Sequence, residues 1–200
     1  MASPCLLPLE CGNSMLIGGS QSGKSTYMAK LLLAHKHVFR HRINQILYIY
    51  GEEQDMNQTL KKSLGDMIIF RQGFPPESEL DDFIEQQRNQ YSVIVFDDMV
   101  TESKQNSELV LKWFVQKSHH SKCYIFYLTQ FLFNDNITRS LHKQAHYLFM
   151  FKQLRYKNSM AILASQLCPG KVGFFMDAYD KAMSRGQFSV FIICVHPLID

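Results

Sequence analysis

Residues 14–33, SMLIGGSQSGKSTYMAKLLL, decide the fold of this chain of 200 residues. Residues 18–25 fit the pattern G-x-x-x-x-G-K-[ST] at every required position. Glycine-rich loops of this kind turn successive backbone N–H groups toward phosphate oxygens, and the positive end of the following helix faces the same oxygens. The apolar residues 15–17 predict a buried strand that enters the loop, and residues 26–34 predict a helix that leaves it. The sequence therefore predicts a phosphate-binding strand–loop–helix unit.

The loop supplies the residues that are expected to hold a nucleotide and its metal ion. They form one continuous run: Gly18, Gly19, Ser20, Gln21, Ser22, Gly23, Lys24, Ser25 and Thr26. Within this run, Lys24 is expected to reach the β- and γ-phosphates of ATP, and the Ser25 hydroxyl is expected to hold Mg²⁺. The structural alternative is a glycine turn followed by a surface lysine.

A second signal is an apolar run with an acidic end. Residues 93–96, VIVF, are followed directly by Asp97 and Asp98, which is a Walker B pattern. Because Mg²⁺ prefers oxygen ligands and keeps several waters, Asp97 is expected to bind the ion through one of those waters. Asp98 faces a different direction and is expected to orient or polarise an attacking water. The alternative is a strand that ends in two solvated aspartates, which the upstream phosphate loop disfavours.

A third signal is Gln130, which follows the apolar residues 124–128. Its side chain is expected between the two Walker strands, where it senses the γ-phosphate or positions water, as glutamine does in other phosphoryl-transfer sites. The chain has no N-K-x-D motif, no L-S-G-G-Q signature and no arginine-rich lid. These absences argue against a GTPase, a transporter-type ATPase and a nucleoside kinase.

Alternating strand and helix patterns predict an α/β fold with a mostly parallel, doubly wound sheet. Further strands are predicted at 45–50, 67–70, 92–96, 124–128, 147–151 and 188–195, and further helices at 78–89, 108–117, 137–143, 159–167 and 173–183. Trp113 is expected in the core. Residues 1–13 are predicted to be an irregular lead-in, and residues 14–200 one domain.

Composition and charge narrow the class of protein. The apolar fraction of 46% and the charged fraction of 20% are ordinary for a globular protein. A net charge of +3 permits contact with nucleic acid but does not argue for it. The basic residues 35–42 have two interpretations, a solvated helix end or a nucleic-acid site, of which the helix end is preferred. Five scattered cysteines, no secretion signal and no apolar run of about 20 residues predict a soluble intracellular protein without a membrane span.

Residues 117–122 carry Lys117, His119, His120 and Lys122 in a loop expected next to the active-site strands. Two adjacent histidines point in different directions, so a shared metal site is not expected there. The loop has two interpretations, contact with DNA or a neighbouring subunit, or a solvated connection between a helix and a strand.

Taken together, these motifs resemble a known family. The Walker A loop, the Asp97–Asp98 pair and the strand-end Gln130 look like the FtsK–HerA superfamily of ring-forming P-loop ATPases. The second half is closer to the DNA-packaging ATPases of Polinton/Maverick and adintovirus-like elements, which are relatives of the poxvirus packaging ATPase. The stretches that carry the resemblance are residues 48–52, 96–99 with Glu102, 117–120, 128–133, 145–147 with 151–152, 169–171 and 196–197. They extend over nearly the whole chain, residues 14–198.

The resemblance implies a RecA-like core that forms a homo-oligomeric ring and uses ATP and Mg²⁺ to drive double-stranded DNA into a capsid. It implies capsid or packaging proteins as further partners, and the host nucleus, cytoplasm or virion as the location. DNA contacts would go to phosphates, so they would be independent of sequence and sensitive to salt. In such rings a neighbouring subunit often supplies an arginine to the γ-phosphate. Arg139 precedes the Ala-His-Tyr strand as the family's arginine does, whereas Arg155 lies in QLRY where the family has NPRD, so Arg139 is preferred.

Two other functions stay open on the residues alone. One is a small P-loop kinase that passes the γ-phosphate to a nucleotide or a metabolite. The other is a nucleotide-binding assembly subunit without catalysis, against which Asp97, Asp98 and Gln130 argue.

Overall fold

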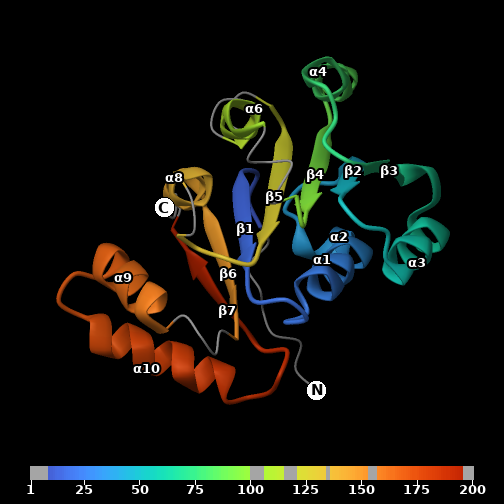
Figure 1. The fold of residues 1–200 in the computed structure, drawn as a ribbon. Helices are drawn as coiled ribbons and strands as arrows, with labels where there is room; N and C mark the ends of the chain where they lie inside the picture. Colours follow the sequence, from blue (N-terminus) through green and yellow to red (C-terminus); the bar gives the residue numbers. More distant parts are fainter. Residues whose placement is uncertain (1–8, 100–105, 115–120, 134–135, 153–156, 196–200) are drawn as a thin grey trace.

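The computed structural model describes residues 9–99, 106–114, 121–133, 136–152 and 157–195. The described elements are β1 (Asn13–Ile17), α1 (Lys24–Leu33), α2 (His35–Val38), β2 (Ile43–Tyr50), α3 (Asp55–Leu64), η1 (Gly65–Met67), β3 (Ile68–Gln72), α4 (Glu77–Gln86), β4 (Tyr91–Asp97), α6 (Ser107–Lys112), β5 (Cys123–Thr129), α8 (Asn136–Gln144), β6 (Tyr147–Phe151), α9 (Lys157–Leu167), α10 (Val172–Met183) and β7 (Val190–Cys194). Strands alternate with helices along most of the chain, which confirms the predicted α/β class (Figure 1).

The strands form one sheet in the order β3-β2-β4-β5-β1-β6-β7. Every neighbouring pair is parallel except β6 and β7, which run antiparallel. The mostly parallel sheet is therefore confirmed, and its one antiparallel strand is the last. Strand β1 lies between β5 and β6. After β1 the chain builds β2 to β5 on one side of it, and then crosses to the other side to form β6 and β7. Ligands of doubly wound sheets bind where strand order reverses in this way.

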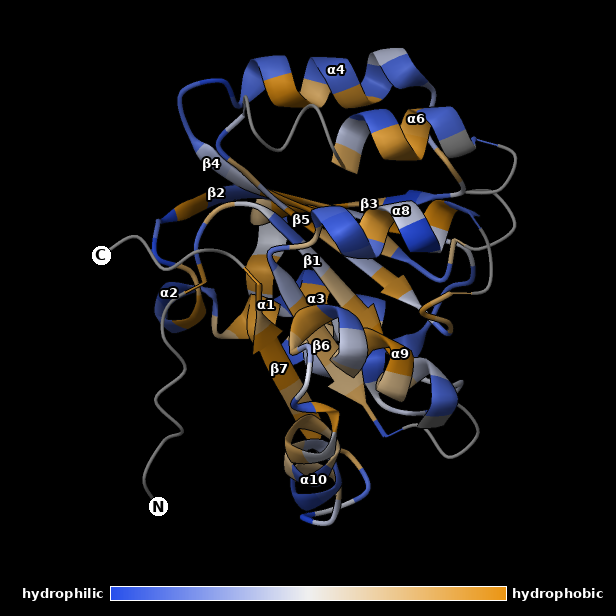
Figure 2. Ribbon diagram, turned by 90° about the vertical axis from the view of Figure 1, so that its left-hand side faces the viewer, coloured by the Kyte–Doolittle hydropathy of each residue, from blue (hydrophilic) through white to orange (hydrophobic). Residues whose placement is uncertain are grey.

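Helices cover both faces of the sheet (Figure 1). One core cluster joins the sheet to α4, α6, α8, α9 and α10, and includes Trp113, which is fully buried as predicted. A second cluster joins the opposite face to α1 and α3 through residues such as Leu32 and Leu60. Figure 2 shows the central strands in the hydrophobic colour between helices whose outward sides are hydrophilic. Burial on both faces is the reason why these strands are continuous apolar runs.

The two central strands bring the acidic and amide residues to one edge. Every residue of β5 is buried, and so is every residue of β4 after Tyr91. In the parallel register Asp97 pairs with Leu128, and on the other side of β5 Ile17 pairs with Thr129. The carboxyl ends of β1, β4 and β5 therefore meet at the start of the phosphate loop.

Two helices differ from the sequence-based expectation. The polar stretch that begins at Asp55 forms the ten-residue helix α3, which was not predicted. Only Asn57 and Leu60 of this helix are fully buried, but Met56, Leu60 and Leu64 recur every four residues and pack against the second core cluster, so the sequence did carry a helical signal in this polar stretch. Part of the basic run forms the short helix α2, none of whose residues is buried. Among the described residues no helix is long and apolar enough to cross a membrane.

Candidate nucleotide-binding site

The phosphate loop connects β1 to α1, as the sequence predicted. Gly23 precedes the helix in the left-handed region, with φ of 92°, and Gln21 also has a positive φ, of 60°. The N–H of Gly18 donates to the carbonyl of Thr129 at 3.1 Å, which ties the loop to the end of β5. No side chain caps the first turn of α1. Its free N–H groups, together with the helix dipole, make this turn suited to an anion.

The two glycines that the motif requires are sterically required here as well. A Cβ on Gly18 would lie 2.5 Å from Oγ of Ser22 and 2.6 Å from Cβ of Phe151. A Cβ on Gly23 would lie 2.9 Å from Cδ1 of Phe188, in a backbone conformation that side chains rarely adopt. A Cβ on Gly19, a variable position of the motif, would meet nothing within 4 Å.

Lys24 closes the loop on itself. Its Nζ donates to the carbonyl oxygens of Gly18, at 2.8 Å, and Gly19, at 3.0 Å. Burial lowers the pKa of Lys24, while the negative charges of Asp97 and Asp98 oppose that shift. A partly buried ammonium that two carboxylates keep charged is a strong point charge for phosphate oxygens.

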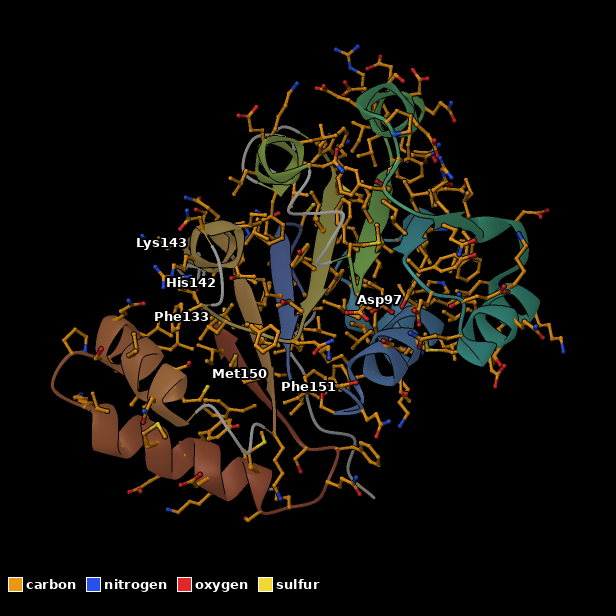
Figure 3. All side chains as sticks on the ribbon, in the orientation of Figure 1. Asp97, Phe133, His142, Lys143, Met150 and Phe151 are labelled. Carbon is orange, nitrogen blue, oxygen red and sulfur yellow. The ribbon has the colours of Figure 1, made fainter. Side chains whose placement is uncertain are left out.

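Asp97 ends β4 (Figure 3). The residue is only 2% exposed. Its Oδ1 accepts a hydrogen bond from Oγ of Ser25 at 3.1 Å, and its Oδ2 accepts one from the hydroxyl of Tyr48 at 2.5 Å. Burial raises the pKa of Asp97, and the hydrogen bonds from Tyr48 and Ser25 oppose this shift. Both predicted metal residues are therefore in contact with each other.

Tyr48 was missed by reasoning from the sequence. It lies on β2, and its neighbour two residues on, Tyr50, pairs with Asp97 in the parallel register. The available signal was a tyrosine in the middle of a buried strand, because a buried tyrosine hydroxyl usually finds a hydrogen-bond partner. The sequence does not say that β2 and β4 are neighbours, so the partner could not be named.

Asp98 and Gln130 form a second polar pair at the same edge. Asp98 is exposed and has a positive φ, of 54°, which is uncommon for a residue other than glycine. Nε2 of Gln130 lies 3.5 Å from Oδ1 of Asp98. Strained backbone of this kind is concentrated at functional sites. The sheet order places β5, and hence Gln130, between the strands of the phosphate loop and of Asp97, as predicted.

One pocket collects these groups. It has a volume of about 260 Å³ and is lined by Ser20, Gln21, Ser22, Gly23, Lys24, Ser25, Thr26, Gln54, Asp97, Asp98 and Gln130. All the predicted catalytic and metal residues except Arg139 line it, and so do most of the predicted nucleotide-binding residues. Gln54, from the polar loop before α3, joins them without having been predicted. Oγ of Ser22 is buried and has no protein partner, so a polar atom of the loop remains available to a ligand.

The predicted arginine lies elsewhere. Arg139 is exposed on α8, where its Nε donates to the carbonyl of Phe133 at 3.3 Å, and it does not line the pocket. Its role in a neighbouring subunit stays a prediction. Arg155, Glu102, residues 117–120 and residues 196–197 lie outside the described residues.

The pocket fits Mg²⁺ in its donor chemistry. Ser25 and Asp97 present a hydroxyl and a carboxylate side by side, and Mg²⁺ takes one or two protein oxygens together with phosphates and waters. Within the described part of the chain there is no cluster of three or more His, Cys, Asp or Glu side chains suited to a metal ion.

Several solved structures share this fold at low sequence identity. The genome packaging NTPase B204 from Sulfolobus turreted icosahedral virus 2, in complex with ATP-gammaS, superposes with a TM-score of 0.56 at 16% identity, over 92% of each chain. ATPases 2 and 3 of EssC from Geobacillus thermodenitrificans give a TM-score of 0.56 at 12% identity. The cytoplasmic domain of the Type VII secretion ATPase EccC from Thermomonospora curvata gives 0.57 at 13%.

The chain spans different shares of these proteins. It covers 34% of the EssC chain and 24% of the EccC chain, with 76% and 92% of its own length aligned. No family model and no curated protein matches the sequence. The structural likenesses establish the RecA-like P-loop fold that the resemblance to the FtsK–HerA superfamily implied.

Proposed function

We propose that this protein is a Mg²⁺-dependent ATPase that drives the movement of double-stranded DNA, as a genome-packaging motor does. The observation that carries the ATPase part is the convergence of three groups on one pocket. Lys24, the Ser25–Asp97 pair and the Asp98–Gln130 pair all line this pocket. Each pair comes from two different elements, so the arrangement is a product of the fold.

We assign the following roles, and the geometry of the pocket supports them. Lys24 and the backbone N–H groups at the start of α1 bind the β- and γ-phosphates. Ser25 and Asp97 hold Mg²⁺, which when bound neutralises charge on those phosphates. Asp98, the exposed carboxylate, orients the attacking water and accepts its proton as the bond to the γ-phosphorus forms and the bond to the leaving ADP oxygen breaks. Gln130 holds Asp98 in place and senses the γ-phosphate.

The motor part rests on other grounds. The fold matches a protein described as a genome packaging NTPase over 92% of both chains. The motifs after Asp98 also resemble those of DNA-packaging ATPases. We therefore propose a homo-oligomeric ring, with double-stranded DNA and capsid or packaging proteins as its partners. In such a ring the exposed Arg139 would reach the γ-phosphate held by a neighbouring subunit.

Phosphate release from ATP, measured with and without double-stranded DNA, tests the proposal. We expect DNA to stimulate release, Lys24→Ala to abolish it, and Asp98→Asn to keep ATP binding while losing hydrolysis. Lys62→Ala, an exposed lysine on α3, is the matched control and is expected to behave as the parent protein. Equal turnover by Asp98→Asn and the parent would contradict the role of Asp98.

Two further measurements separate the other candidate functions. The appearance of a phosphorylated nucleotide or metabolite in place of free phosphate would identify a kinase. Tight ATP binding without hydrolysis would identify a non-catalytic assembly subunit. A protein that stays monomeric with ATP and DNA both present would contradict the ring.

A further inference from the structure

A second cavity lies at the opposite edge of the sheet from the nucleotide pocket. Its volume is about 480 Å³. We call it the basic pocket, and it is lined by His35, Lys36, Phe39, Arg40, His41, Arg42, Ile43 and Met67. Ile43 is the first residue of β2, so this cavity opens at the amino ends of the strands, whereas Asp97 closes the carboxyl end of β4. The two cavities therefore lie at opposite ends of the strands, and each can hold a ligand of its own.

The basic pocket has a large excess of positive charge. Lys36, Arg40 and Arg42 are exposed cations within seven consecutive residues. Glu10 forms an ion pair with Arg40, and Asp66, next to the lining residue Met67, is an exposed acid on the same side. Two cations and two histidines of the lining then remain without an ion pair among the described residues. Such a surface suits a ligand with several negative charges.

The aromatic side chains around the pocket are engaged with one another. His41 stacks on Tyr91 with ring centres 3.8 Å apart and planes at 6°, and its Nδ1 lies 3.0 Å from the hydroxyl of Tyr124. Nζ of Lys122 lies 5.7 Å from the centre of the Tyr91 ring, which extends the cationic surface beyond the pocket. Phe39 is 4% exposed and packs edge-on against Tyr124. Phe39 and Tyr124 are buried, and the partly exposed His41 and Tyr91 rings are stacked on each other, so the surface presents its cations beside rings that already have partners.

The exposed cations and the mutually packed rings of the basic pocket together favour one class of anionic ligand. Single-stranded nucleic acids are held by stacking of bases on open aromatic faces, together with charge. A duplex hides its bases and offers phosphates, which arginine and lysine neutralise without reading sequence. Guanidinium groups such as those of Arg40 and Arg42 match phosphate geometry with two parallel hydrogen bonds. The engaged rings and exposed cations of the basic pocket fit the duplex.

We propose that the basic pocket is a second phosphate-binding site, which holds the backbone of double-stranded DNA at the amino edge of the sheet. The choice of DNA as the polyanion rests on the proposed motor function. The site is separate from the residues that hydrolyse ATP, so its loss weakens the grip on DNA and leaves hydrolysis without DNA unchanged.

The test is the salt dependence of duplex binding by the full chain, measured by fluorescence anisotropy. The pocket variant combines Lys36→Gln, Arg40→Gln and Arg42→Gln. The control variant removes equal charge near α10, with Lys171→Gln, Lys181→Gln and Arg185→Gln, all exposed. The logarithm of the duplex binding constant falls linearly with the logarithm of the salt concentration, and each phosphate contact steepens that slope by about 0.9. We therefore expect the slope of the pocket variant to be about 2–3 shallower than the parent's, and the slope of the control variant to be the same as the parent's. Arg40 and Glu10 are both exposed, and the loss of an exposed ion pair changes stability little, so we expect the variant to stay folded.

The outcomes separate this inference from the proposed function. If the parent protein hydrolyses ATP but does not bind the duplex, both the motor proposal and this site fail. If the parent binds the duplex and the pocket variant keeps the parent's slope, only this site is overturned. Tighter binding of poly-glutamate than of duplex, through the same three residues, would assign the pocket to an acidic protein. Displacement of the duplex by inorganic phosphate at constant ionic strength would assign it to a small anion.

Discussion

The hydroxyl of Tyr48 lies 2.5 Å from Oδ2 of Asp97, and both side chains are buried between β2 and the phosphate loop. Burial, and then the neighbouring Asp97 carboxylate, raise the pKa of Tyr48 well above its ordinary value, so its hydroxyl stays protonated and donates. The other carboxylate oxygen of Asp97 accepts from Ser25. Tyr48 thereby fixes the rotation of the carboxylate whose other oxygen accepts the hydrogen bond from Ser25.

Replacing Tyr48 by Phe is expected to raise the Mg²⁺ concentration needed for half-maximal hydrolysis by about tenfold. Partners that orient metal ligands typically contribute 10–100-fold in metal affinity or activity. ATP binding without metal is expected to stay unchanged, since Lys24 and the loop are untouched. A Mg²⁺ titration of hydrolysis, with a Mg²⁺-free nucleotide-binding assay beside it, measures both quantities.

Tyr50→Phe is the matched control for this change. Tyr50 lies on the same strand and is only partly buried, with its ring edge-on to Phe70. The Tyr50→Phe variant is expected to need the same Mg²⁺ concentration for half-maximal hydrolysis as the parent protein. If Tyr48→Phe lowered turnover at saturating Mg²⁺ and left the Mg²⁺ midpoint unchanged, the positioning role of Tyr48 would be wrong.

Asp97→Asn is expected to stabilise the ligand-free protein while abolishing hydrolysis. The raised pKa of Asp97 means that its ionised form is less favourable in the folded chain than in the unfolded chain. Its contribution to stability is therefore present at low pH and lost as pH rises through the folded-state pKa. Asparagine is neutral and retains an oxygen for Tyr48 and an amide donor for Ser25.

Thermal denaturation across pH measures this effect. We expect Asp97→Asn to melt higher than the parent at neutral pH, by about 2–4 °C for each kcal/mol in a chain of this size. The advantage should vanish in acid, near the ordinary aspartate pKa of about 4 and below. A lower melting temperature for the variant at neutral pH would mean that the carboxylate contributes net stability to the folded chain.

The central strands and the phosphate site were predictable because their signals are local. Residues 93–96 are an apolar run that ends in acid, and the phosphate loop is defined by glycines that the structure shows to be sterically necessary at Gly18 and Gly23. Gln130 could be placed between the Walker strands because parallel strands deliver their carboxyl ends to one edge.

Other features of the fold and the site depended on contacts between distant parts of the chain. The Tyr48–Asp97 hydrogen bond follows from the register of β2 and β4, which strand patterns do not encode. Helix α3 is an exception, because its signal was local: Met56, Leu60 and Leu64 recur every four residues and pack against the second core cluster, within a stretch that is otherwise polar. The basic run was interpreted as a solvated helix end, and only the fold turned it into the wall of a cavity.

Phe188→Ala is expected to raise the KM for ATP by about tenfold and to leave kcat unchanged. The Phe188 ring lies against Gly23 of the phosphate loop, yet 64% of the residue is exposed. An exposed aromatic face beside the phosphate loop suits a nucleobase, and aromatic pairs contribute about 0.5–1.5 kcal/mol beyond the area they bury.

Steady-state kinetics with ATP and with tripolyphosphate test this assignment. Phe188→Tyr should restore the parent's KM for ATP, and Phe174→Ala, which removes an even more exposed ring from α10, should not change it. Tripolyphosphate has no base, so its KM should be equal in the parent and in Phe188→Ala. An equal rise for both substrates would mean that Phe188 supports the loop and not the base.

Arg139→Ala is expected to abolish hydrolysis in a pure ring and to regain it when mixed with Lys24→Ala. Arg139 is exposed and does not line the nucleotide pocket of its own chain, so the proposed contact is with a neighbour's nucleotide. In a mixed ring some interfaces pair an intact phosphate loop with an intact arginine, because each variant supplies what the other lacks. Hydrolysis measured against the mixing ratio should rise from zero, pass through a maximum and fall again.

Lys143→Ala, which removes another cation from α8, serves as the control and should be active without mixing. An active pure Arg139→Ala ring would exclude this arginine from the reaction.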